Sequence, residues 1–184
     1  PADFFSREIR GKLAIKTAQY SNLTFSAGYQ RQDDIDYPGR LLNAEYFDTQ
    51  NYAGRWHFER SGGNLRSATA LAYYNRVQHG MNNDGKPTAA PDENRMPPFP
   101  LRVTVDADVD VVGGRLTTQW RPDPQWNLTV GADLYSASKS ALRRITNRNN
   151  GMVPPPLQPQ PDLMWPYTRT TDGGLFTRAE RSLP

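Results

Sequence analysis

Apolar and polar residues alternate along much of this chain with a period of two, which is the period of a β-strand. The alternation is clearest over residues 23–29, 52–58 and 128–134. At least four segments sustain it for roughly ten residues, the length that a tilted strand needs to cross a bilayer. The pattern therefore predicts long strands with one apolar side and one polar side.

Three pairs of these segments are joined by short stretches of turn-forming residues. The first pair meets at Tyr20-Ser21-Asn22, the second at Ser61-Gly62-Gly63-Asn64, and the third, residues 109–120 and 127–138, across residues 121–126. Short Gly-, Asn- and Pro-containing joins between alternating segments are typical of β-hairpins. With a seventh strand expected near Gly174, the sequence predicts an all-β, antiparallel, up-and-down meander of about seven strands, with the two outermost strands unpaired on one side.

The connections between the hairpins are much longer, at about residues 31–45, 81–108 and 139–171. They are rich in Pro, Asn, Asp and Gly, and the proline-rich residues 154–161 cannot join a ladder because proline lacks a backbone donor. Bacterial outer-membrane barrels alternate short periplasmic turns with long extracellular loops in this way. Residues 1–184 are therefore predicted to be part of an antiparallel transmembrane β-barrel, too short to close by themselves.

The composition agrees with a barrel wall better than with a compact domain. Mean hydropathy is -0.77 and hydrophobic residues make up only 36% of the chain. A strand between lipid and water needs an apolar residue only at every second position. The sets 23, 25, 27, 29 and 128, 130, 132, 134 are expected on the convex, lipid-facing side. The concave, lumen-facing side is expected to carry Arg55, His57, Glu59, Arg115 and Gln119.

Aromatic residues near the predicted strand ends are expected to form the girdles that flank the apolar band of such barrels. These residues are Tyr20, Trp56, Tyr73, Tyr74, Trp120, Trp126 and Tyr135.

Several function classes are disfavoured by what the sequence lacks. It has no cysteine, which excludes disulfides and thiolate ligands within the chain. The net charge of +3 comes without a run of like charges, so nucleic-acid binding is not expected. No catalytic motif occurs, which predicts that the chain is not an enzyme. There is no transmembrane-helix stretch and no leader at Pro1-Ala2-Asp3, so any secretion signal is expected outside these residues.

A series of short segments resembles the barrel of TonB-dependent outer-membrane receptors, and is nearest to the copper-receptor branch. The segments lie at residues 37–40, 48–52, 71–83, 113–116 and 131–135. The resemblance implies a large barrel plugged by an N-terminal domain, as in outer-membrane transporters. It also implies outer-membrane lipid around the barrel, TonB as the partner that acts through the plug, and no required cofactor. The cargo would be a scarce nutrient, either a metal ion or a metal chelate, with copper as one candidate.

The sharpest chemical candidate is the pair His79 and Met81, at the junction of a predicted strand with a long loop. Residues two apart on an extended backbone point to the same side, so an imidazole nitrogen and a thioether can reach one Cu(I) or Cu(II) ion. In the copper receptors that the sequence resembles, a His-x-Met pair supplies the barrel ligands, and Cys and Met of the plug supply the others. Asn82 and Asn83 follow the pair here, where that family commonly has an Asp.

Two other functions fit the same pattern. A passive porin or adhesin barrel would have strands and loops of this kind but no plug, and a signal peptide running directly into strands would favour it. A soluble β-sandwich binding module would show turn signals at regular spacing. Long strands and two connections near thirty residues weigh against the sandwich, which would have two sheets packed face to face.

Overall fold

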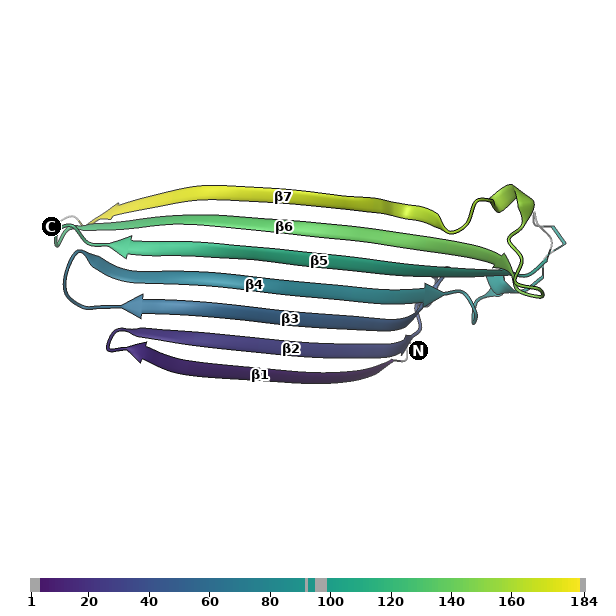
Figure 1. The fold of residues 1–184 in the computed structure, drawn as a ribbon, viewed down its shortest axis with the longest axis horizontal. Coiled ribbons are helices and arrows are strands. Elements are labelled where there is room, and N and C mark those ends of the chain that lie inside the picture. Colours follow the sequence, from purple (N-terminus) through teal and green to yellow (C-terminus); the bar gives the residue numbers. More distant parts are fainter. Residues whose placement is uncertain (1–3, 92, 95–98, 183–184) are drawn as a thin grey trace.

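The computed structural model describes residues 4–91, 93–94 and 99–182. They form seven long β-strands and two single-turn 3-10 helices (Figure 1). The elements in chain order are β1 (Phe5–Ala18), β2 (Ser21–Ile35), β3 (Asn43–Glu59), β4 (Leu65–Asn82), η1 (Pro87–Ala89), β5 (Leu101–Trp120), β6 (Trp126–Asn147), η2 (Pro155–Leu157) and β7 (Asp162–Arg181).

All seven strands belong to one antiparallel sheet, in the order β1-β2-β3-β4-β5-β6-β7. Within the described residues, β1 pairs only with β2 and β7 pairs only with β6, so the sheet is open at both edges. The predicted fold class is confirmed, with about seven strands in a meander and no closure. The β-sandwich interpretation is wrong, because the described strands form a single sheet rather than two packed layers.

The short and long connections gather at opposite ends of the sheet, as Figure 1 shows. The short-turn end holds residues 19–20, 60–64 and 121–125, and the loop end holds residues 36–42, the described residues of the connection 83–100, and residues 148–161. Gly63 in the second short turn has φ of 82°, a left-handed conformation that glycine adopts without a Cβ penalty. The alternation of short and long connections that the sequence predicted therefore places the short turns at one end of the sheet and the long connections at the other.

The strands run further toward the loop end than the sequence pattern predicted. The three long connections are residues 36–42, 83–100 and 148–161 instead of about 31–45, 81–108 and 139–171, and β7 begins at Asp162 instead of near Gly174. Ladder hydrogen bonds come from the backbone, so pairing continues after the apolar alternation has ended. Residues 154–161 stay outside the ladder, as the prolines predicted.

The register divides the side chains between two continuous faces. One row across the apolar face consists of Leu13, Phe25, Gly54, Ala72, Gly114, Leu134 and Gly173. The polar face carries Arg55, His57, Glu59, Arg115 and Gln119. The two sets expected to face lipid therefore share one face, and the polar side chains expected to face the lumen lie on the other.

The apolar face becomes polar at one level of the sheet. Tyr52 and Tyr74 lie at that level with ring centroids 6.3 Å apart, and the next side chains toward the loop end are Gln50 and Arg76. Trp56, Tyr74, Trp120 and Trp126 share the apolar face, as an aromatic girdle requires.

The prediction that Tyr73 and Tyr135 belong to the aromatic girdle is wrong. Both alternate onto the polar face, where the Tyr73 ring covers Gly113 so closely that a Cβ there would meet its hydroxyl at 2.4 Å. The side-chain period of two fixes these positions.

Little of the sheet is covered by protein. The buried apolar residues of the described chain are small ones, namely Ala44, Ala68, Ala89, Val105, Ala107 and Ala141. Large side chains on the apolar face stay exposed, including Leu134 at 59% and Leu175 at 89%. An apolar surface of this extent is typical of a region that contacts lipid or another protein.

None of the helices in the described residues is long and apolar enough to span a membrane.

Candidate metal site

His79 and Met81 lie near the loop end of β4 and project from the polar face. His79 is paired with Phe47 of β3 and Ala107 of β5, while Met81 is paired with Ala44 and Val105. Their Cα atoms are two residues apart on a strand, or about 6.6 Å. The polar face also carries His57 and Arg115 at other levels, so the two candidate ligands share the face predicted to line a lumen.

The His79 ring is held flat against the Phe47 ring. The two centroids are 4.6 Å apart and the planes are 12° from parallel. The Nδ1 atom of His79 is buried and has no hydrogen-bond partner among the described residues. Because buried polar atoms in native proteins normally have partners, this nitrogen is a position where a ligand from outside these residues can add a bond.

Met81 borders a small apolar cluster beneath the β2–β3 loop. Val105, Ala107 and Ala141 form the buried cluster, and Leu42 and Met81 pack against it. A recess of about 620 Å³ lies between Met81 and the loop, and Tyr37, Gly39, Arg40, Leu41 and Leu42 form the rest of its wall. The thioether is therefore half-buried beside a space large enough for a small ligand.

A bulge in β3 brings the loop into this position. The register of β3 against β4 shifts between Ala44 and Tyr46, which leaves Glu45 as the extra residue. Bulges bend a strand and redirect its side chains. Here the bulge places Ala44, which is 1% exposed, opposite Met81.

Gly80, between the two candidate ligands, accommodates a ring on the opposite face of the sheet. A Cβ at Gly80 would lie 2.5 Å from the Tyr46 ring, which is closer than real Cβ contacts allow. Tyr46 is paired with Gly80 across the ladder. The absence of a side chain at position 80 therefore lets Tyr46 pack directly over the backbone that connects His79 to Met81.

The substitution Gly80→Ala is expected to destabilise the fold by about 1–3 kcal/mol, the usual cost of overpacking. The added methyl group must displace the Tyr46 ring or the backbone of residues 79–81. Urea unfolding of the full-length protein in detergent measures the effect. Adding Tyr46→Leu should restore most of the loss, whereas equal losses with and without Tyr46→Leu would show that the ring contact is not the cause.

Asn83 fixes the chain immediately after the candidate ligands. Its side-chain Oδ1 accepts a hydrogen bond from the Val103 N–H at 2.8 Å, and its Nδ2 donates to the Leu101 carbonyl at 3.0 Å. The Asn83 N–H donates to the Val103 carbonyl at 3.2 Å. The side chain is 1% exposed. Asn83 thus attaches the start of the β4–β5 connection to the first residues of β5.

Lys86 connects the β4–β5 loop with the β2–β3 loop. Its Nζ donates to Asp36 Oδ1 and to the Tyr37 carbonyl, both at 2.9 Å, and its side chain is largely buried. The Lys86 hydrogen bond holds the pKa of the Asp36 carboxyl below its usual range. The loop that forms the wall of the recess beside Met81 is therefore anchored by a buried ammonium group.

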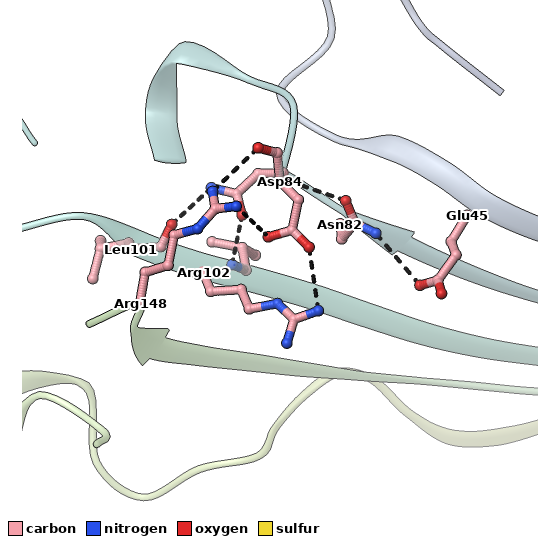
Figure 2. Close-up of polar contacts among 8 residues, drawn as sticks. Glu45, Asn82, Asp84, Leu101, Arg102 and Arg148 are labelled. Carbon is pink, nitrogen blue, oxygen red and sulfur yellow. Dashed lines mark hydrogen bonds and ion pairs between the residues drawn. The ribbon is translucent and has the colours of Figure 1, made fainter. Parts of the chain in front are cut away.

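A second set of polar contacts connects the loop end of β4 with β5 and with the β6–β7 loop (Figure 2). Asp84 Oδ2 pairs with Arg102 Nη2 at 3.2 Å, and the Asp84 carbonyl accepts a hydrogen bond from Arg148 Nη1 at 3.1 Å. Asn82 Oδ1 accepts from the Asp84 N–H at 3.0 Å, and its Nδ2 faces Glu45 at 3.4 Å. Together with the Lys86 contacts, these polar contacts join the three long connections to one another at the loop end of the sheet.

The sequence pattern identified the two candidate ligands but not their surroundings. Phe47 reaches His79 through strand register, Tyr46 covers Gly80 from the opposite face, and Lys86 holds the neighbouring loop through a long-range contact, none of which spacing along the chain reveals. In the described part of the chain, no group of three or more His, Asp or Glu side chains could hold a metal ion. A metal bound by His79 and Met81 would therefore need further ligands from elsewhere.

No protein-family profile matches this sequence, and no curated protein is similar to it. Among solved structures, one titled "Copper transporter OprC" superposes with a TM-score of 0.75 at 21% sequence identity. The match covers 97% of this chain and 26% of that one, so the chain spans about a quarter of the length of that structure. At this identity the likeness concerns the fold, and the seven-stranded sheet has the architecture of one section of that transporter.

Proposed function

We propose that this chain is part of a TonB-dependent outer-membrane receptor that takes up copper, and that His79 and Met81 are copper ligands on the lumen side of the barrel. The observation that carries the proposal is the placement of both side chains on the polar face, with Met81 beside a recess beneath the β2–β3 loop. A nitrogen and a thioether suit copper in either oxidation state.

Three further features support the proposal. The apolar face extends over about five alternate residues of each central strand, close to the ~9–11 residues that a tilted transmembrane strand needs. The short turns and the long connections lie at opposite ends, as in barrels with periplasmic turns and extracellular loops. The structure with the same fold is named as a copper transporter.

The remaining parts of such a receptor would lie outside residues 1–184. A plug would supply the other copper ligands and the contact with TonB, and outer-membrane lipid would cover the apolar face. A passive porin remains the second candidate, because an open seven-stranded sheet of this kind fits either barrel.

The test is copper content of the purified full-length protein. Replacing His79 and Met81 together by Ala is expected to lower the copper-to-protein ratio at least severalfold, because two ligands of one ion are lost. The matched control is His57→Ala, which removes the other histidine of the chain from the same face at the far end of the sheet. Copper content that is equal in the wild type and the double variant would eliminate the site and favour an organic chelate as the cargo.

A further inference from the structure

A polar recess of about 780 Å³ lies at the short-turn end of the sheet, far from the candidate metal site. It lies between the turn of residues 60–64 and the turn of residues 121–125. Thr69, Thr117 and Gln119 contribute to its wall from the polar face of β4 and β5. The recess therefore opens on the polar face and not on the apolar one.

The charged groups that line this recess are mostly cationic. Arg60, Arg66 and Arg121 all contribute to it, and Glu59 is the one carboxylate among the described lining residues. Glu59 Oε2 lies 3.4 Å from Nε2 of His57. Three guanidinium groups against one carboxylate give the recess an excess of positive charge, which favours a negatively charged occupant.

Arg66 owes its position to a β-bulge. The register of β4 against β5 shifts between Leu65 and Ser67, so Arg66 is the extra residue. A bulge redirects a side chain that regular alternation would send elsewhere. The Nε atom of Arg66 is buried and has no hydrogen-bond partner among the described residues, which leaves a charged donor without an acceptor.

Backbone contacts hold the two turns in place around the recess. The Arg60 N–H donates to the Arg66 carbonyl at 2.8 Å, and the Arg121 N–H donates to the Asn64 carbonyl at 2.7 Å. The Arg60 guanidinium lies 5.7 Å from the centroid of the Tyr20 ring. The backbone of both turns is thus positioned before any ligand arrives, which reduces part of the ordering cost of binding.

We propose that this recess binds carboxylate groups of an acidic polypeptide segment that approaches the short-turn end through water. Guanidinium groups bind carboxylates through short, charge-assisted and often bidentate hydrogen bonds. Arg60 and Arg121 occupy two separate turns and Arg66 lies at the start of β4, so an extended segment with several carboxylates can contact all three. Lipid phosphates are disfavoured, because lipid would cover the apolar face and the recess opens on the opposite one. The inference does not depend on copper.

The experiment measures binding of a fluorescein-labelled octaglutamate peptide to the full-length protein in detergent by fluorescence anisotropy. The wild type is expected to bind octaglutamate, with an affinity that falls as added salt screens the charges. It is expected not to bind a labelled octaglutamine peptide. Arg66→Gln and Arg121→Gln are each expected to weaken binding about tenfold, as loss of a charge-assisted hydrogen bond implies. Arg144→Gln, which removes an exposed arginine at the loop end, should leave the affinity unchanged.

Folding of each variant is checked by its shift on unheated gels, and two independent arginine variants guard against one that fails to fold. The proposal is overturned if the wild type does not bind octaglutamate or binds octaglutamine equally well. It is also overturned if Arg66→Gln and Arg121→Gln behave like Arg144→Gln.

Discussion

Replacing Leu134 by Arg is expected to destabilise the full-length protein by about 1–2 kcal/mol, because Leu134 lies one level from the row where the apolar face becomes polar, between the middle of a barrel's lipid-facing band, where an arginine costs ~2–4 kcal/mol, and its interface, where the cost falls to ~0–1 kcal/mol. Leu134 lies on the apolar face of β6, between Gly114 and Gly173, and is 59% exposed within the sheet. Its exposure means that a soluble protein would tolerate the change. Urea unfolding in lipid vesicles, followed by tryptophan fluorescence, measures the loss.

The matched control is Tyr135→Arg, one residue further along β6. Tyr135 alternates onto the polar face, where Asp172 is its partner on β7. A charge there can remain hydrated and is expected to change stability by less than about 1 kcal/mol. If both substitutions cost the same, or if Leu134→Arg costs nothing, the apolar face is not the one in contact with lipid.

Asn83→Ala is expected to cost about 2–4 kcal/mol, because it removes two side-chain hydrogen bonds from a buried site where an unsatisfied group costs ~1–3 kcal/mol. The Val103 N–H and the Leu101 carbonyl both lose the Asn83 amide as a partner. Since these bonds attach the loop that carries Lys86, hydrogen exchange in the β2–β3 and β4–β5 loops should accelerate as well. Unfolding and hydrogen exchange of the full-length protein measure the two effects.

Two further variants serve as comparisons for Asn83→Ala. Asn83→Asp keeps the acceptor for the Val103 N–H but loses the donor to the Leu101 carbonyl. Its change in the free energy of unfolding should therefore differ from that of Asn83→Ala. Asn149→Ala changes an exposed asparagine of the β6–β7 loop and should stay within about 0.5 kcal/mol of the wild type. A loss at Asn83 no larger than at Asn149 would mean that the buried amide does not anchor the loop.

At the candidate site, the sequence motif predicted the two candidate ligands but not the residues that surround them. His79 and Met81 follow from spacing alone, because residues two apart on a strand share a face whatever their neighbours are. Phe47 lies opposite His79 only because of the β3–β4 register, and Ala44 lies opposite Met81 only because β3 carries a bulge at Glu45, which nothing in the local sequence marks. The recess beside Met81 further depends on Lys86, which reaches Asp36 from another loop.

The sequence by itself determined the strand count, the meander order, the two faces and the separation of short turns from long loops. Each of these follows from a local period of two and from where proline and glycine interrupt it. Only the tertiary structure decided where the strands end, because polar segments such as residues 139–147 continue the ladder through backbone bonds that side-chain pattern does not predict. It also decided that the Tyr73 ring packs over Gly113, and that a bulge turns Arg66 into the recess at the short-turn end. Both depend on pairing between strands, which brings together residues far apart in the sequence and is set by the whole sheet.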